Sequence, residues 1–372
     1  MSPRERERYA RHLLLPEIGE TGQTRLAQAT VAVVGAGGLG CPALQYLAAA
    51  GVGCIRVIDS DIVERSNLQR QILFTDGEVG QNKADVAAAR LRAQNPLIQV
   101  EAHPVRLTAR NAAELLTGAD VIVNGADNFP TRYLVSDASV LLGVPHVHGA
   151  VHRVEGEVSV FLPGGPCYRC LHPTPPAPGT VPSCSEAGVL GVLPGLVGTL
   201  QATETLKLLL GLGLPLVGRF LLLDALTLRF RELRLARNPA CAACGDAPTI
   251  HQLTDLPGVQ CATGEQVMRE ITPVELKAKL DRGDNFLLID VREPGEFELC
   301  RIPGAKLIPL GTIPQRMGEL DPDAEIVLQC RSGKRSADAL TFLQANGFTN
   351  MWNLKGGILA WADDVDPTIV KY

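Results

Sequence analysis

The stretch VAVVGAGGLG, Val31–Gly40, leads an apolar β-like run directly into four glycines. Gly35, Gly37 and Gly40 have the spacing G-x-G-x-x-G, in which glycine permits a tight turn and a close approach of the backbone to phosphate. A helix that starts there offers its N-terminal amides to the same phosphate. Asp59 ends the next β-like run, about where a carboxylate binds a ribose hydroxyl. Taken alone, the motif predicts a nucleotide-binding domain and is as typical of a dinucleotide dehydrogenase as of any other enzyme.

Strand-like and helix-like segments alternate outward from this loop to about residue 145. The alternation predicts a Rossmann-like, doubly wound and largely parallel α/β sheet. We interpret 220–235 as late strands of the same domain, and a second, smaller α/β unit begins at Ile271. We therefore expect a first domain at 1–248, a linker at 249–268 and a second domain at 269–372. The expected strands are 31–35, 54–59, 98–105, 120–127 and 144–151, and the expected helices are 41–51, 83–95 and 132–143.

Composition narrows the class of protein. A chain of 372 residues, 46% of them hydrophobic and 20% charged, has the length and the core for two folded domains. Its net charge of −5 argues against a nucleic-acid or anionic-membrane partner. The apolar stretch 188–216 contains Pro194, Gln201, Glu204 and Lys207, which favours a buried helix over a membrane span. No secretory signal is apparent, so the ten cysteines point to metal binding or catalysis in the cytoplasm rather than to disulfides.

Polar residues after the glycine loop indicate which nucleotide is bound. Asn67, Arg70 and Lys83 could all serve a polyphosphate, although Arg70 and Lys83 could also be solvated surface charges. A triphosphate concentrates more charge than a dinucleotide, and its reaction needs cations where charge builds up. Asp127 lies at the C-terminal end of an expected strand, where open α/β sheets bind ligands and where a carboxylate suits phosphate-bound Mg²⁺. The ordered set favours ATP chemistry.

Four motifs together resemble the adenylating enzymes that activate ubiquitin-like proteins, above all the bacterial molybdopterin-synthase and thiamin-biosynthesis adenylyltransferases. They are GAGGLG (35–40), DSDIVERSNLQRQ (59–71), VGQNKAD (79–85) and GADNFPTR (125–132), and the resemblance covers roughly residues 5–245. It implies that Arg11 enters the ATP site of a neighbouring subunit, and hence a homodimer. The other implied contacts are the ATP loop at Gly37 and Gly38, the ribose at Asp59, the phosphates at Asn67, Arg70 and Lys83, and Mg²⁺ near Asp127.

Two C-x-x-C pairs, Cys167 with Cys170 and Cys241 with Cys244, could supply four thiolates to a structural Zn²⁺. Their separation far exceeds the spacing in zinc fingers. On spacing alone, two unrelated pairs or a redox dithiol are alternatives. The family resemblance implies zinc, because the family places both pairs at these points. The zinc would join the end of the domain to its middle and take no part in the chemistry.

Two further cysteines have settings that suggest reactivity. Cys184 lies in the Pro-rich stretch 172–188, which we interpret as a long exposed loop, and the resemblance places a reactive cysteine there. An incidental thiol would look the same. Cys330 follows a strand-like run and precedes a helix. Loop amides, the helix dipole and three cations are expected to favour its thiolate; the cations are Arg331, Lys334 and Arg335.

The loop at Cys330 suits a sulfur atom better than a phosphate. A Cys-based phosphatase would place arginine at position 336, where this chain has Ser336. The motifs LLIDVREPGEF (287–297), IPGA (302–305), CRSGKRS (330–336) and GGILAW (356–361) resemble a rhodanese sulfurtransferase domain over about 268–372. This implies a persulfide on Cys330, held by the loop Cys330, Arg331, Ser332, Gly333, Lys334 and Arg335. The family usually has Gly-His before IPGA; here Cys300 and Arg301 stand instead, which adds a thiol of unknown reactivity.

Together the resemblances imply ATP-dependent adenylylation of the C-terminal glycine of a ubiquitin-like sulfur carrier that ends in Gly-Gly. A persulfide, loaded from thiosulfate or a cysteine desulfurase, would then give a thiocarboxylate. Molybdopterin synthesis is the favoured pathway; thiamin, cysteine or tRNA thiolation would use the same chemistry. A dehydrogenase and a non-catalytic module that docks sulfur carriers are the other hypotheses. The residues expected to act in catalysis are Arg70, Lys83, Asp127, Cys184 and Cys330.

Overall fold

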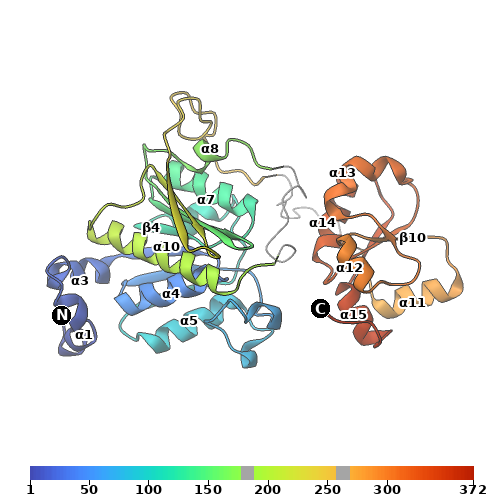
Figure 1. The fold of residues 1–372 in the computed structure, drawn as a ribbon, viewed down its shortest axis with the longest axis horizontal. Coiled ribbons are helices and arrows are strands. Elements are labelled where there is room, and N and C mark those ends of the chain that lie inside the picture. Colours follow the sequence, from blue (N-terminus) through green and yellow to red (C-terminus); the bar gives the residue numbers. More distant parts are fainter. Residues whose placement is uncertain (177–187, 257–268) are drawn as a thin grey trace. The chain divides into compact units, whose positions relative to one another are not determined.

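The structure, a computed structural model, describes residues 1–176, 188–256 and 269–372 (Figure 1). The described chain forms two compact units, the first from 1–176 and 188–256 and the second from 269–372. Each unit has its own sheet and its own hydrophobic cores. The expected α/β fold class is confirmed.

The first unit contains an eight-stranded sheet in the order β3-β2-β1-β4-β5-β6-β7-β8. The strands from β3 to β5 pair in parallel, as the alternating sequence predicted. Those from β5 to β8 pair antiparallel, and β6 is a strand that the sequence pattern did not predict. The strands are β1 (Thr30–Val34), β2 (Cys54–Ile58), β3 (Gln99–His103), β4 (Val121–Asn124), β5 (His146–His152), β6 (Glu155–Phe161), β7 (Arg219–Asp224) and β8 (Arg229–Arg234).

Helices cover both faces of this sheet (Figure 1). Successive residues of β1 point to opposite faces, so that Val31 and Val33 join one core while Ala32 and Val34 join the other. The first core is covered by α3 (Gly19–Gln28), α4 (Gly40–Ala50), α5 (Lys83–Gln94) and α10 (Val192–Leu210), and the second by α6 (Ala112–Leu116) and α7 (Phe129–Leu142). Among its described residues, this unit also contains α1 (Pro3–Arg8), α2 (Ala10–Leu13), α8 (Tyr168–Leu171), η1 (Arg65–Asn67) and η2 (Asp76–Glu78).

The stretch expected to form a buried helix is α10, with Leu193, Val197 and Gln201 fully buried. Across the described ranges, no helix combines the length and the apolar character that crossing a membrane requires.

The second unit has a five-stranded, all-parallel sheet in the order β11-β10-β12-β13-β9. Leu288 and Val327 point into one core and Ile289 and Leu328 into the other, so helices pack on both faces. The strands are β9 (Glu270–Ile271), β10 (Leu287–Asp290), β11 (Lys306–Leu307), β12 (Ile326–Gln329) and β13 (Met351–Leu354). The helices are α11 (Pro273–Arg282), α12 (Pro294–Leu299), α13 (Ile313–Arg316), α14 (Lys334–Ala345), α15 (Gly357–Asp364), η3 (Leu310–Thr312) and η4 (Met317–Glu319).

The expected functional loops follow parallel strands at their carboxyl ends. The glycine loop follows β1, Asp127 follows the adjacent strand β4, and Cys330 follows β12. Carboxyl ends of parallel strands are where open α/β sheets bind ligands. The topology therefore gives each unit one candidate site.

Candidate functional site

The glycine loop after β1 has a conformation that requires glycine at two points. Gly35 has a φ of +93°, and a Cβ there would lie 3.0 Å from the carbonyl carbon of Gly125. A Cβ at Gly40 would overlap the carbonyl oxygen of Gly35. The backbone therefore turns tightly into the N-terminus of α4, as a phosphate-binding loop requires.

Asp59 borders this loop from the end of β2. Its Oδ2 accepts a hydrogen bond from the amide of Ala36 at 2.7 Å, and its Oδ1 accepts one from the amide of Asp61 at 2.8 Å. Burial raises the pKa of Asp59, while the charge of Lys83 acts in the opposite direction. The carboxylate thus lies beside the glycine loop, where a nucleotide ribose is expected.

Lys83 begins α5, and its side chain is only 5% exposed. Its Nζ lies 3.1 Å from Oδ2 of Asp61, whose side chain is 58% exposed. A buried ammonium is costly without an anionic partner, and Asp61 and Asp59 supply that charge. The sequence reasoning did not single out Asp61. The one signal available was its position two residues after Asp59.

Asn67 is buried in η1, and its hydrogen bonds fix the orientation of two side-chain amides. Its Nδ2 donates to Oε2 of Glu64 at 3.0 Å, so its Oδ1 is left to accept from Nε2 of Gln71 at 2.8 Å. Gln71 in turn faces the glycine loop, because a Cβ at Gly37 would lie 3.6 Å from that nitrogen. Asn67 therefore reaches the loop through Gln71, a buried residue that sequence reasoning missed.

Arg70 lies directly against the glycine loop. A Cβ at Gly38 would lie 3.5 Å from Cγ of Arg70 and 2.9 Å from Cβ of Pro194 in α10. Nη1 of Arg70 donates to the carbonyl of Ser66 at 3.2 Å. The structure thus brings together Gly37, Gly38, Asp59, Asn67, Arg70 and Lys83. That they bind a triphosphate stays a prediction.

Asp127 is exposed in the loop between β4 and α7. The preceding residues of this loop touch the glycine loop, since a Cβ at Gly35 would lie 3.3 Å from the amide of Ala126. Arg132 is buried in the first turns of α7, and its Nε donates to the carbonyl of Ala126 at 3.2 Å. Asp127 therefore lies on the same edge as the glycine loop, and a carboxylate oxygen there fits a Mg²⁺ carried by phosphates.

Arg11, which was expected in an ATP site, lies away from the glycine loop of its own chain. It is exposed on α2, and the neighbouring Tyr9 ring packs against Gly51, just beyond the C-terminus of α4. The glycine loop precedes the N-terminus of α4, at the other end of a helix about 16 Å long. Arg11 is thus not brought to the glycine loop of the same chain.

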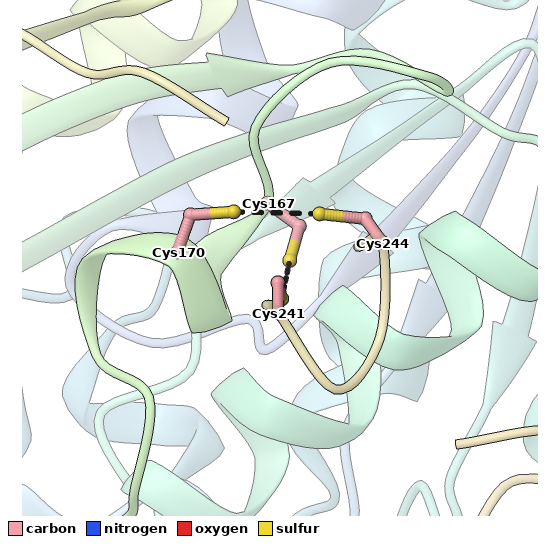
Figure 2. Close-up of side chains that lie close together, drawn as sticks. All are labelled: Cys167, Cys170, Cys241 and Cys244. Atoms are coloured by element: carbon pink, nitrogen blue, oxygen red, sulfur yellow. Dashed lines mark hydrogen bonds between the residues drawn. The ribbon is translucent and has the colours of Figure 1, made fainter. Parts of the chain in front are cut away.

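The two C-x-x-C pairs come together although Cys167 and Cys241 are 74 positions apart. All four sulfur atoms lie within 4.8 Å of one another, and Figure 2 shows the side chains pointing toward a common centre. The Sγ atoms of Cys167 and Cys241 are 3.6 Å apart, and those of Cys170 and Cys244 are 3.3 Å apart. A tetrahedral Zn²⁺ with Zn–S bonds of ~2.3 Å would hold sulfur atoms about 3.8 Å apart.

The electrostatics of this cluster also fit a cation. Burial and the neighbouring thiols raise the pKa of Cys167 strongly, and burial followed by the hydrogen bond with Cys170 raises the pKa of Cys244 to about 12. Four thiolates so close together are stable only around a positive charge. Within residues 1–176, 188–256 and 269–372, this is the one cluster of metal-binding side chains. The residues therefore fit zinc.

Cys330 directly follows β12 and is 1% exposed. Its Sγ accepts a hydrogen bond from the amide of Gly333 at 3.2 Å and contacts Oγ of Ser336 at 3.4 Å. Gly333 has a φ of +89° and precedes α14, so the N-terminus of that helix faces the sulfur. Ser336, read in the sequence only as the residue that excludes a phosphatase, is a direct contact of the sulfur.

The cations expected to favour the thiolate are placed differently from one another. Arg335 forms a bidentate ion pair with Glu296, at 2.7 Å for both oxygens. Arg331 donates from Nε to a main-chain oxygen of Tyr372 at 2.6 Å. Lys334 and Ser332 are exposed. The loop amide and the helix N-terminus thus contact the sulfur as expected, while two of the three cations have partners of their own.

The other two cysteines singled out in the sequence are less informative. Cys184 lies outside the described residues. Cys300 is half-buried, and its Sγ lies 3.7 Å from Nη1 of Arg292, while its carbonyl oxygen accepts from Nη2 of the same side chain at 2.7 Å. Arg292 is itself fully buried and paired with Asp290. Cys300 therefore lies in a structural ion-pair network.

Comparison with known proteins accounts for both units. Residues 9–243 match the ThiF family, and residues 272–364 match the rhodanese-like domain. A probable adenylyltransferase/sulfurtransferase MoeZ of Mycobacterium tuberculosis is 44% identical over 384 residues, covering 100% of this chain and 96% of that protein. A sulfur carrier protein adenylyltransferase of Thermus thermophilus is 58% identical over 257 residues, 68% of this chain and 95% of that protein. The adenylyltransferase and sulfurtransferase MOCS3 of Sus scrofa is 41% identical over 396 residues, 98% and 87% of the two chains.

Solved structures support the fold of the first unit. The crystal structure of E. coli MccB with MccA-N7isoASN aligns with a TM-score of 0.57 at 24% identity, over 64% of this chain and 74% of that chain. The family match extends over well more than half of the chain, and relatives align along nearly all of it. The chain therefore belongs to the ThiF family and carries a rhodanese-like domain after its ThiF domain.

Proposed function

We propose that this chain adenylates the C-terminal glycine of a ubiquitin-like sulfur carrier and converts the adenylate into a thiocarboxylate. The observation that carries the proposal is the convergence of Asp59, Asn67, Arg70 and Lys83 on one glycine loop. Relatives named adenylyltransferase/sulfurtransferase support both steps, and one is named for acting on a sulfur carrier protein. By analogy with them, molybdopterin synthesis is the pathway we favour.

In the first step, the chain's own residues bind the triphosphate and stabilise the charge that develops. Lys83 exchanges its carboxylate partner Asp61 for phosphate oxygens, and Arg70 provides a second cation beside the loop. Asp59 accepts hydrogen bonds from the ribose. A Mg²⁺ near Asp127 would supply further positive charge for the phosphates when bound. The carrier carboxylate attacks the α-phosphate, and pyrophosphate leaves.

In the second step, a thiolate at Cys330 takes a sulfane sulfur from thiosulfate or a cysteine desulfurase and becomes a persulfide. Its terminal sulfur attacks the acyl-adenylate carbonyl, AMP leaves, and an acyl disulfide joins carrier and enzyme. The Cys184 thiolate then attacks Sγ of Cys330, which releases the thiocarboxylate and leaves a Cys184–Cys330 disulfide for a cellular dithiol to reduce. If Cys184→Ala leaves the thiocarboxylate yield intact with reductant present, this last step is wrong.

Further features complete the proposal. Zn²⁺ held by Cys167, Cys170, Cys241 and Cys244 would join two distant segments of the ThiF domain. Its role would be structural. We also propose a cytoplasmic homodimer and retain domain boundaries at 1–248, 249–268 and 269–372.

ATP–pyrophosphate exchange tests the first step. Each carrier ending in Gly-Gly from the same genome is added in turn, and we expect exchange with at least one of them. Lys83→Ala should reduce exchange about 100-fold or more, as removal of one preorganised charge does at other sites. The matched control is Lys207→Ala, because Lys207 is also paired with a carboxylate but lies near the far end of α10 from Pro194. Carrier-independent pyrophosphate chemistry, or none in folded protein, favours a small-molecule acid or a docking module instead.

Subunit complementation tests the proposed role of Arg11. Arg11→Ala and Lys83→Ala homodimers should each be inactive. If Arg11 acts in the partner's site, mixed dimers regain one complete site, and a random mixture recovers at most about a quarter of wild-type activity. No recovery after verified subunit exchange would place Arg11 outside the partner's site.

A further inference from the structure

Glu296 and Tyr372 form a network beside the Cys330 loop that the steps above do not use. Glu296 lies in α12 and binds Arg335 through both carboxylate oxygens, at 2.7 Å each. The hydroxyl of Tyr372 donates to Oε1 of Glu296 at 2.8 Å and accepts from Nη1 of Arg292 at 2.6 Å. One carboxylate and one phenol thus link α12, α14 and the end of β10.

Tyr372 also holds the other arginine of the loop. A main-chain oxygen of Tyr372 accepts from Nε of Arg331 at 2.6 Å, and the Tyr372 ring centroid lies 5.5 Å from the Arg331 guanidinium. Arg331 directly follows Cys330, and Arg335 directly precedes Ser336, which contacts the sulfur. Both arginines therefore belong to the loop that holds the sulfur, and their guanidinium groups are bound by Tyr372 and Glu296.

The charge of this network follows from its burial and its hydrogen bonds. Burial alone would raise the pKa of Glu296, but the hydrogen bonds from Arg335 and from the Glu293 amide, joined by that from Tyr372, lower it to about 2. Glu296 is therefore a carboxylate at any physiological pH and offsets the charge of Arg335. Without it, the loop would present an additional uncompensated cation to any ligand of Cys330.

We propose that Glu296 and Tyr372 are positioning residues for sulfur transfer at Cys330, which hold Arg335 and Arg331 in fixed places and set the charge that an anionic sulfur donor meets. The inference rests on the proposed persulfide at Cys330. It predicts tighter binding of the sulfur donor in a variant, an effect that loss of folding cannot produce. Removing the Glu296 charge should improve binding of a dianionic donor, because the charge of Arg335, a residue of the Cys330 loop, is then no longer compensated.

The test uses the full chain and thiosulfate as donor with cyanide as acceptor. The Cys330 thiolate attacks the sulfane sulfur, sulfite leaves, and cyanide removes the sulfur as thiocyanate and restores the thiolate. Glu296→Gln should lower KM for thiosulfate about 3- to 10-fold, with a steeper dependence on ionic strength and a smaller change in kcat. Glutamine also preserves the capping box of α12, in which Glu296 accepts from the amide of Glu293 at 3.0 Å. The matched control is Glu298→Gln, which removes the same charge from an exposed position on the same helix.

The Tyr372 variants test the positioning of Arg331 separately from the charge of Glu296. Tyr372→Ala keeps the main-chain oxygen that binds Arg331 but removes the ring beside Arg331 and the hydroxyl that anchors Tyr372 to Glu296 and Arg292, and it should lower kcat several-fold. Tyr372→Phe keeps the ring beside Arg331 and should restore most of the lost kcat. Equal KM values for Glu296→Gln and Glu298→Gln would overturn the inference. Cys330→Ala, measured in parallel, distinguishes failure of the proposed persulfide from failure of the positioning role. Sulfur transfer that survives it refutes the proposed persulfide, whereas its loss together with equal KM values refutes only the positioning role.

Discussion

Replacing Gly357 with alanine tests how the loop that carries Cys330 is supported. Gly357 has a φ of +60° at the start of α15, and a Cβ there would overlap the carbonyl oxygen of Cys330 and lie 2.7 Å from the carbonyl oxygen of Arg331. The next residue donates its amide to the carbonyl of Cys330 at 2.8 Å. The turn between β13 and α15 therefore packs directly beneath the sulfur loop, and only glycine fits at this position.

The expected cost has three parts. A left-handed conformation costs a non-glycine residue about 1–2 kcal/mol, and overpacking against a backbone that must shift costs about 1–3 kcal/mol. Loss of the hydrogen bond to Cys330 adds about 1 kcal/mol. We expect Gly357→Ala to lower the free energy of unfolding of the second unit by about 4 kcal/mol in sum. The control is Gly347→Ala, because Gly347 has a φ of +94° but no atom within 4 Å of an added Cβ. It carries the conformational cost alone, about 1–2 kcal/mol.

Tryptophan fluorescence in guanidinium chloride measures both variants in the full chain. The protein has two tryptophans, Trp352 and Trp361, and both are in the second unit, so the signal reports on that unit alone. Thiosulfate sulfurtransferase activity is measured on the same samples, and Gly357→Ala should lose far more of it than Gly347→Ala. Equal losses of stability and of activity in the two variants would refute the reasoning.

Three further predictions follow from the sites. Purified protein should contain one zinc per chain, and Cys241→Ala should lose the metal and lower the calorimetric melting temperature of the ThiF domain; a metal-free protein with an unchanged melting temperature contradicts the zinc assignment. Cys330→Ala should abolish sulfur transfer while ATP–pyrophosphate exchange remains, since the residues proposed for the two chemistries lie in different units; joint loss in folded protein argues against the proposed division. Because the pKa of Glu296 falls from 4.5 to about 2 on folding, its ion pair stabilises the second unit above pH 4.5, and this contribution of at most about 3 kcal/mol is lost as the pH falls toward 2. In fluorescence-monitored unfolding, Glu296→Gln should make the stability of the second unit less dependent on pH. An unchanged pH dependence would show that the ion pair of Glu296 does not cause the loss of stability in acid.

Several features of the protein could be predicted from the sequence because they depend on local chemistry. The glycine spacing at 35–40 predicts its tight turn, since a positive φ and a close backbone approach exclude other residues. The alternation of apolar strands and amphipathic helices predicts the parallel half of the first sheet and the α/β second unit. The ordered polar residues after the loop predict that Asn67, Arg70 and Lys83 share one site.

Other features were decided by the tertiary structure. Short strands at 155–161 and 219–234 do not reveal whether they pair parallel or antiparallel. Spacing alone could not join Cys167 to Cys241 or Arg335 to Glu296, because partners 74 and 39 positions apart meet only through the path of the whole chain. For the same reason, the arginines beside Cys330 looked like cations for the sulfur, whereas the fold gives them partners of their own. Local sequence determines backbone conformation and the chemistry a residue can offer, but the partner that uses this chemistry is set by long-range packing.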